Sequence, residues 1–310
     1  MMKLNSGRTL YYGKGDVLSY RTYAEPLVVK EIPESDYTGD NNIIFAHNIK
    51  FAVSGESLLP SFSEGDNSLV VATDSMKNFI LRHTSDYTGS TTEGLLAHIS
   101  SKFMERYPHI DAIEVSADRM PFTAVDVNGM PSDLVFRRSR NEHASASLKL
   151  VRGESGAAEV ALHESKISHI QLIKVYGSSF YGFVRDEYTT LPDSYDRPLY
   201  IYLDIFWTYE NAEDGIDAGN ERYVPAEQIH DITHTLFHLT NSPSIQDLIY
   251  KVGGKILTRF PQLKEVRFES NNRTWETVVE PANSDAAGVY TEPRPPFGFQ
   301  GFTMSKEDLA

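Results

Sequence analysis

The chain has 310 residues, 40% of them hydrophobic, and a formal net charge of −14 at pH 7. This length allows one large domain or two of about 150 residues, and the hydrophobic content is enough for a buried core, which excludes global disorder. The negative charge argues against a nucleic-acid-binding surface. Cysteine is absent, which excludes disulfides, thiolate catalysis and cysteine-based zinc sites.

Predicted strands follow one another along most of the chain. Segments rich in Val, Ile, Tyr, Phe and Thr are typical of antiparallel β-strands. In chain order these are residues 8–23, 42–53, 67–72, 147–151, 171–175, 199–209 and 229–239.

A helix followed by a strand occurs twice. Residues 93–115 align without a gap on residues 246–268. In both copies hydrophobic residues recur at helical spacing, a proline then ends the helix (Pro108 and Pro261), and an alternating segment predicts a strand. A repeat of strands and helices of this kind predicts an α+β fold.

The termini and the hydropathy indicate a cytoplasmic protein without membrane contact. The first ten residues lack the hydrophobic region of a signal peptide, and no run approaches the roughly 18 apolar residues of a membrane span. The last three residues differ from the Ser-Lys-Leu peroxisomal signal.

Two motifs point to a known family. They are F-Y-G-F-V-R-D-E-Y-T-T-L-P-D-S-Y-D-R at residues 180–197 and V-V-A-T-D-S-M-K-N at residues 70–78. Together they resemble urate oxidase, the cofactor-free uricase family. The resemblance runs in unchanged order from Y-G-K-G-D-V at residues 12–17 through S-I-Q-D-L at residues 244–248. It implies oxidation of urate by dioxygen and water to 5-hydroxyisourate and hydrogen peroxide, a step of purine catabolism, without a metal or organic cofactor.

The family resemblance also implies an architecture, the tunnelling fold or T-fold. Residues 1–155 would form the first repeat, and residues 156–310 the second repeat with the C-terminal tail. Each repeat is an antiparallel sheet with helices on one face, and two subunits close a β-barrel around a tunnel. The expected assembly is a homotetramer of two such dimers. Closure would remove exposed sheet edges.

Lys14 lies between Gly13 and Gly15. A lysine in such a turn is normally solvated, but a buried or cation-adjacent lysine can have a lowered pKa and act as a base. The resemblance implies the second role, because the catalytic lysine of the family occupies this Tyr-Gly-Lys pattern.

Thr73 and Asp74 follow a short hydrophobic run. Asp74 and Ser75 could cap a helix that begins near Met76, or the free N–H groups of that helix could bind an anion, and both can hold. The resemblance implies that Thr73 passes protons with Lys14, and that the amides of Thr73 and Asp74 hold the five-membered ring of urate.

Arg197 and Gln246 are the predicted clamp for the purine. From the residues alone, Arg197 could form an ion pair with a nearby carboxylate (Asp186, Glu187 or Asp196), or its planar guanidinium could bind the paired acceptors of urate at two points. The resemblance implies the clamp, with Phe180 stacked on the purine, Gln246 at the opposite edge and the backbone of Ile245 beside it.

Asn271 lies in a polar segment, where an asparagine commonly forms a turn. The resemblance implies that Asn271 holds dioxygen or water above the purine plane. The chain departs from the family two positions further on. Many relatives have a histidine there that completes a relay with lysine and threonine, whereas this chain has Arg273.

Three histidines, His230, His234 and His238, have the spacing of a metal site if their segment is helical. Its β-branched residues indicate a strand instead, in which positions four apart are about 13 Å distant. On that interpretation they cannot share one metal, and we expect none. The tail at residues 292–304 contains Phe297, Phe299 and Phe302 and is either disordered or covers a surface.

Two other functional classes remain open at this point. One is another tunnelling-fold enzyme for pterins or purines, a group that typically anchors its ligand with a glutamate. The other is a purine-binding protein that has lost catalysis.

Overall fold

The computed structural model describes residues 2–138, 140–273, 275–283 and 286–309. The chain forms two compact units. Unit 1 consists of Met1–Glu31, Tyr37–Lys166 and Thr208–Pro225, and unit 2 consists of Ile32–Asp36, Ile167–Trp207 and Ala226–Ala310. The assignment of residues 1–155 and 156–310 to two tunnelling-fold repeats stays a prediction.

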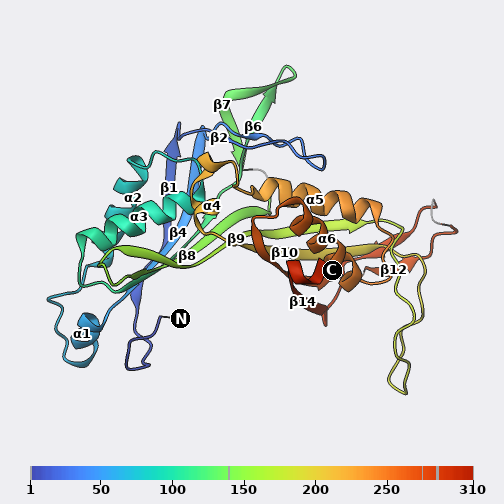
Figure 1. Ribbon diagram of the computed structural model, residues 1–310. Helices are drawn as coiled ribbons and strands as arrows, with labels where there is room; N and C mark the ends of the chain where they lie inside the picture. The colour runs from blue at the N-terminus through green and yellow to red at the C-terminus, as the bar shows by residue number, and fades with distance from the viewer. Residues whose placement is uncertain (1, 139, 274, 284–285, 310) are drawn as a thin grey trace. The chain divides into compact units, whose positions relative to one another are not determined.

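Unit 1 is an antiparallel sheet covered by helices on one face (Figure 1). Its strands lie in the order β1 (Tyr12–Thr22), β4 (Ile44–Ser54), β5 (Ala112–Arg119), β8 (His143–Arg152) and the first part of β9 (Ala158–Lys174). Helix α2 (Thr73–Ser85) packs on β1, and α3 (Thr92–Arg106) packs on β5 and β8. Phe51 of β4 and Phe103 of α3 are fully buried, with ring centres 5.0 Å apart.

Unit 2 repeats this arrangement. Its sheet contains the second part of β9, then β10 (Leu199–Tyr209), β11 (Leu263–Asn272) and β14 (Gly298–Ser305). Helices α5 (Ala226–Leu239) and α6 (Ile245–Arg259) contact each other, and α6 packs on β11 and β14. The chain is therefore an α+β protein with a large antiparallel sheet.

The helix–strand repeat predicted from the sequence is confirmed. Helix α3 leads into β5, and α6 leads into β11. Both helices begin with a hydroxyl cap, because the Thr91 side chain accepts a hydrogen bond from the Gly94 N–H and the Ser244 side chain accepts one from the Asp247 N–H.

Two of the predicted strands are wrong. Residues 229–239 belong to helix α5, whose buried positions include Ile229, Ile232, Thr233 and Phe237, at the spacing of one helical face. Packing of that face outweighs the strand preference of its β-branched residues. Residues 67–72 form no strand, since the Val70 N–H donates to the Asn67 carbonyl in a turn that leads into α2.

The tail is ordered as an edge strand. Strand β14 pairs antiparallel with β11, placing Phe302 opposite Phe268 and Gly298 opposite Asn272. Disorder is therefore wrong for residues 298–304, whereas the alternative in which the tail covers a surface stays a prediction, since Phe299 is 84% exposed.

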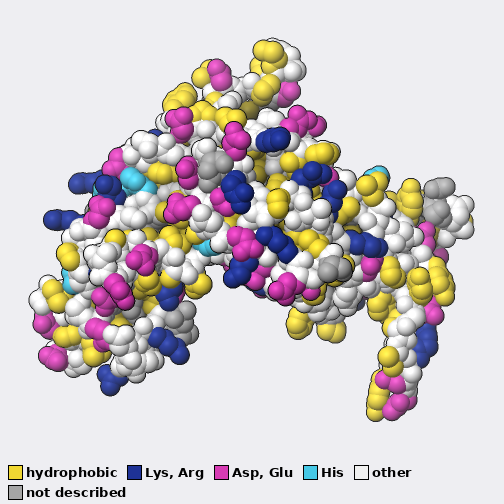
Figure 2. Space-filling model, viewed as in Figure 1, with side chains coloured by type: hydrophobic (Ala, Val, Ile, Leu, Met, Phe, Trp, Pro, Cys, Tyr) yellow, Lys and Arg dark blue, Asp and Glu magenta, His cyan; other side chains and the backbone are white. Residues whose placement is uncertain are grey.

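The remaining elements lie outside the strand order of the large sheet given above. A hairpin of β6 (Phe122–Val127) and β7 (Met130–Arg138) carries exposed hydrophobic side chains, visible in yellow at the top of Figure 2. None of the helices in the described part of the chain is both long and apolar enough to cross a membrane. The other elements are β2 (Leu27–Val28), β3 (Gly39–Asp40), η1 (Glu56–Leu58), α1 (Leu59–Ser63), α4 (Glu213–Ile216), η2 (Ala218–Asn220), β12 (Glu276–Val279), β13 (Val289–Thr291) and η3 (Lys306–Leu309).

Candidate active site

The predicted site residues fall into two groups. Lys14, Thr73 and Asp74 belong to unit 1, and Phe180, Arg197, Ile245, Gln246 and Asn271 belong to unit 2. Each group is described within its own unit.

A pocket of about 370 Å³ in unit 2 collects most of the second group. Its walls come from the loop before β10, the start of α6, the end of β11 and the tail. The lining residues are Ser178, Ser179, Phe180, Leu191, Arg197, Leu199, Ile245, Gln246, Asn272, Arg294, Pro296, Phe297, Gly298 and Gln300.

Backbone hydrogen bonds bring Phe180 next to Arg197. Phe180 and Ser194 exchange two of them, with N···O distances of 2.7 and 2.9 Å, and the Arg197 N–H donates to the Ser178 carbonyl at 2.8 Å. The intervening residues therefore form a loop that is closed at its base. The Arg197 guanidinium carbon lies 5.3 Å from the centre of the Phe180 ring.

Arg197 is partly buried, and none of the described residues is an acidic partner for it. Its Nε is buried without a hydrogen-bond partner, and burial lowers the pKa of its guanidinium. Among the described residues no carboxylate lies within ion-pair distance of Arg197. Asp196, one of the partners considered from the sequence, instead accepts a hydrogen bond from the Gly177 N–H at 2.6 Å. The ion-pair alternative has no support among the described residues, and the guanidinium, whose Nε is buried, borders a pocket that can receive an anionic ligand.

Ile245 and Gln246 form the first turn of α6, after the Ser244 cap. The Ser179 N–H donates to the Ser242 carbonyl at 3.3 Å, which joins the turn before α6 to the Phe180 segment. Gln246 is exposed, whereas Ile245 is buried. The amide of Gln246 is thus available at the pocket, and the first-turn N–H groups of a helix favour negative charge.

Asn272, rather than Asn271, lines this pocket. Neighbouring residues of a strand point to opposite faces of the sheet, and Asn271 contributes to a different cavity of about 540 Å³. The Asn272 Oδ1 accepts a hydrogen bond from Gln300 Nε2 at 3.2 Å, which leaves its amide N–H groups for another partner. The pocket that contains Arg197 is therefore bordered by Asn272 and not by Asn271, and the dioxygen-holding role expected for Asn271 stays a prediction.

Lys14 on β1 and Thr73 at the start of α2 belong to elements that pack on each other in unit 1. The Val71 N–H donates to the Tyr12 hydroxyl at 2.8 Å, which joins the strand to the segment before the helix. Hydrogen bonding and charge from Lys77 hold the pKa of Asp74 below its usual range, with a smaller contribution from the charge of Lys14.

Helix α2 begins at Thr73 and has no side-chain cap. Its N-cap residue is Ala72, and the Asp74 carboxylate binds Lys77 and Asn78 within the helix. The alternative in which Asp74 caps a helix that begins near Met76 is therefore wrong. Without a side-chain cap, the first-turn N–H groups, including those of Thr73 and Asp74, are donors for an external acceptor.

The sequence matches the uricase family over residues 49–149 and 163–300. The chain belongs to the uricase family. A "Uricase" from Haloferax volcanii is 50% identical over 96% of this chain and 98% of that protein. The crystal structure of a uricase from Bacillus fastidious, 54% identical, superposes with a TM-score of 0.95 and covers 97% of this chain and 95% of that chain.

A longer uricase-family relative is the "Uric acid degradation bifunctional protein" of Bacillus sp. strain TB-90. It is 51% identical over 99% of this chain. The chain spans 62% of the length of that relative.

Arg273 is the residue at which the sequence interpretation expects the chain to depart from the relay of the uricase family. Its Nε donates to Asn271 Oδ1 at 3.1 Å, and its guanidinium carbon lies 3.8 Å from the centre of the Tyr202 ring. Arg273 does not line the pocket that contains Arg197. Its side chain is engaged by Asn271 and Tyr202.

The three histidines His230, His234 and His238 lie on a helix and not on the predicted strand. The strand distance of about 13 Å between positions four apart therefore does not argue against a shared metal. On helix α5 the rings of His230 and His234 are 3.7 Å apart, and with Asp231 they offer ligand atoms within 4.8 Å of one another. His238 is outside that group.

Proposed function

We propose that the protein is a urate oxidase, which converts urate, dioxygen and water to 5-hydroxyisourate and hydrogen peroxide without a metal or organic cofactor. The observation that carries this proposal is the Arg197 guanidinium, whose Nε is buried, which has no carboxylate partner in the described part of the chain, and which lies over Phe180 in a pocket with Gln246. Membership of the uricase family supports it.

The pocket has the groups that a flat purine anion requires. Its volume of about 370 Å³ lies in the range of small-molecule sites. A planar guanidinium binds paired carbonyl and ring-nitrogen acceptors at two points. The Gln246 amide has a donor and an acceptor for the opposite edge, the Ile245 backbone lies beside it, and the Phe180 ring supports the purine face.

Proton transfer is assigned to Lys14 and Thr73. Deprotonation makes urate electron-rich enough to reduce dioxygen directly, so the protein needs to deprotonate, position and stabilise its substrate. The Thr73 hydroxyl can both accept and donate a proton toward the Lys14 amine. The amides of Thr73 and Asp74 are donors for the five-membered ring. For the oxygen species we propose the Asn272 amide in place of Asn271.

We further propose that each site is shared between two subunits. Lys14, Thr73 and Asp74 come from one subunit, and Phe180, Arg197, Gln246 and Asn272 come from the subunit that closes the barrel with it. The assembly is then a homotetramer of two barrel-forming dimers with the tunnelling fold. A cytoplasmic location and the absence of nucleic-acid and membrane partners complete the proposal.

Oxygen consumption by metal-stripped protein tests the proposed reaction. With urate added, a urate oxidase consumes one dioxygen and releases one hydrogen peroxide for each urate lost. A non-catalytic purine-binding protein binds urate without oxygen uptake. A pterin or purine enzyme of another kind transforms a different substrate and leaves urate unchanged. The described lining of the pocket contains no glutamate, the ligand anchor typical of that third class.

A further inference from the structure

Two histidines and an aspartate meet between α2 and α3 in unit 1, outside the proposed urate site. His83 Nδ1 lies 2.9 Å from Asp86 Oδ2, and His98 Nε2 lies 2.8 Å from Asp86 Oδ1. His83 belongs to α2, Asp86 is the residue that ends α2, and His98 belongs to α3. One carboxylate thus joins imidazoles from two helices.

The three ligand atoms lie within 4.8 Å of one another. Ligands of a tetrahedral zinc ion, at about 2.0–2.2 Å from the metal, are about 3.3–3.5 Å apart. The two nitrogen–oxygen contacts go to different oxygens of the Asp86 carboxylate. A carboxylate that binds through one oxygen must therefore turn so that this oxygen reaches that distance from both ring nitrogens. The Asp86 side chain is about half exposed, which leaves room for this rotation, whereas the His83 and His98 side chains are each about one-quarter exposed.

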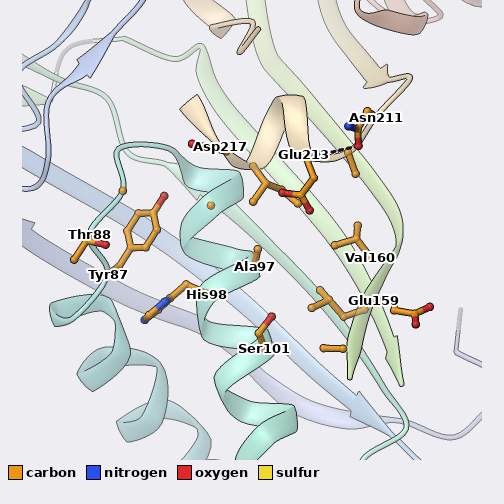
Figure 3. A pocket seen from close by; sticks show the side chains of 16 residues that line it. Tyr87, Thr88, Ala97, His98, Ser101, Glu159, Val160, Asn211, Glu213 and Asp217 are labelled. Carbon is orange, nitrogen blue, oxygen red and sulfur yellow. Dashed lines mark hydrogen bonds between the residues drawn. The ribbon is translucent and has the colours of Figure 1, made fainter. Parts of the chain in front are cut away.

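A cavity of about 810 Å³ opens beside His98. Figure 3 shows His98 and Tyr87 on one side of this pocket, with Glu159 and Glu213 on the other. Its described lining also includes Asp217 and contains no lysine or arginine. Carboxylates around a cavity raise the local concentration of cations, and the cavity has room for the water that completes a three-ligand metal site.

We propose that His83, Asp86 and His98 form a binding site for a divalent transition-metal cation of the zinc class, which ties the end of α2 to α3. Two imidazoles and a carboxylate are suitable ligands for such cations. In the metal-free protein the histidine N–H groups donate to Asp86. When the metal binds, each of these ring nitrogens loses its proton to the other nitrogen of the ring or to solvent and uses its lone pair as the ligand. The role of the metal is structural and not catalytic, because His83 is ten residues from Thr73 of the proposed urate site, which is about 15 Å along α2.

Aromatic rings next to His83 and His98 hold the two imidazoles in place. The His83 ring centre lies 4.1 Å from that of Phe79, and the His98 ring centre lies 5.6 Å from that of Tyr87. These contacts limit the orientations of both imidazoles. Pre-organised ligands of this kind lose less conformational freedom when the metal binds.

Calorimetric titration of the untagged, metal-stripped full chain with Zn²⁺ tests the site. We expect one Zn²⁺ per chain, a higher Tm with Zn²⁺ present, and a visible Co²⁺ spectrum of low coordination number. The sequence has no cysteine, so thiolates cannot contribute to any of these signals. Substitution His98→Gln removes one ligand and should weaken Zn²⁺ binding by at least about 100-fold. Asp86→Asn serves as the second variant if His98→Gln does not fold.

Two control variants locate the metal. His109 lies in the same unit and bonds the Leu69 carbonyl through Nε2 at 2.9 Å, so His109→Gln should leave Zn²⁺ binding unchanged. His234→Gln tests the other histidine pair, on α5. The proposal is overturned if the wild type binds no stoichiometric Zn²⁺, if both His98→Gln and Asp86→Asn bind it as well as the wild type, or if only His234→Gln abolishes binding.

Discussion

The Arg197 guanidinium lies over the Phe180 ring with its Nε buried and unpaired. In a folded protein a buried donor of this kind normally has a partner, since an unsatisfied donor costs free energy. The arrangement is explained if the partner is a ligand. It also separates two roles that the sequence leaves open for this arginine, because a structural ion pair would require a carboxylate at this position.

Substitution Arg197→Lys should raise the KM for urate by about 10- to 100-fold, because an ammonium cannot reproduce a planar two-point clamp. The free energy of unfolding should change little, since no ion pair is lost. Steady-state kinetics and thermal melts on the same preparations measure both quantities. A large drop in Tm with an unchanged KM would instead assign Arg197 a structural role.

Substitution Lys14→Met should lower kcat much more than it alters KM. A group that moves protons acts mainly in the transition state, and general acid–base groups contribute about 10²- to 10⁴-fold. Urate-dependent oxygen uptake at saturating urate measures the effect. A near-normal kcat in this variant contradicts the assignment of Lys14.

The neighbouring asparagines provide a matched pair of variants. Asn272→Ala should lower kcat by about 10²-fold, because it removes an amide at the pocket where the oxygen species is held. Asn271→Ala should keep a near-wild-type kcat, since that side chain accepts from Arg273 on the other face of the strand. If the larger loss of kcat is found in Asn271→Ala, Asn271 holds the oxygen species, as the sequence predicts. The position of Asn272 in the pocket would then not identify the residue that holds oxygen.

Two inactive variants should restore activity to each other if each site is shared between subunits. In a mixed dimer of Thr73→Ala with Arg197→Ala, one site carries both defects and the other carries neither. Random pairing makes half of the dimers mixed, so co-expression should recover about one quarter of wild-type activity. Mass measurement of the intact assembly must show that mixed dimers form. An inactive mixture with mixed dimers present assigns all these residues to a single subunit.

Glu34 should stabilise unit 2 in a pH-dependent manner. Its carboxylate accepts from Arg259 at 2.8 and 2.9 Å and lies 2.8 Å from Lys255 Nζ. The hydrogen bond from Arg259 is the largest cause that lowers the pKa of Glu34 from 4.5 to about 2. The stabilisation is therefore complete above about pH 4.5 and is lost as the pH falls toward 2.

The corresponding variant is Glu34→Gln, which should lower the free energy of unfolding by about 1–2 kcal/mol at pH 7. The difference from wild type should shrink as the pH falls from 4.5 toward 2. Glu187→Gln, in an exposed loop, is the control that should show no difference. Denaturant titrations at a series of pH values measure both, and a difference that does not depend on pH contradicts the role of Glu34.

The sequence by itself determined the parts of this protein whose signals are local or repeated. The α3–β5 and α6–β11 pairs were predictable because hydrophobic spacing, a stopping proline and strand alternation occur together in each copy. The motifs that contain Thr73, Asp74, Phe180 and Arg197 indicated the uricase family in the same direct way, since those residues lie in continuous stretches of sequence.

Only the tertiary structure decided the features that depend on packing between distant segments. Helix α5 forms despite its β-branched residues because one face is buried, and local preference does not contain that information. The proposal that Asn272, in place of Asn271, holds the oxygen species depends on which face of β11 borders the pocket. A shift of one residue along a strand moves a side chain to the opposite face. Likewise, Ile32–Asp36 belongs to unit 2 because Glu34 binds Arg259 and Lys255, charged residues that lie more than 200 positions away in the sequence.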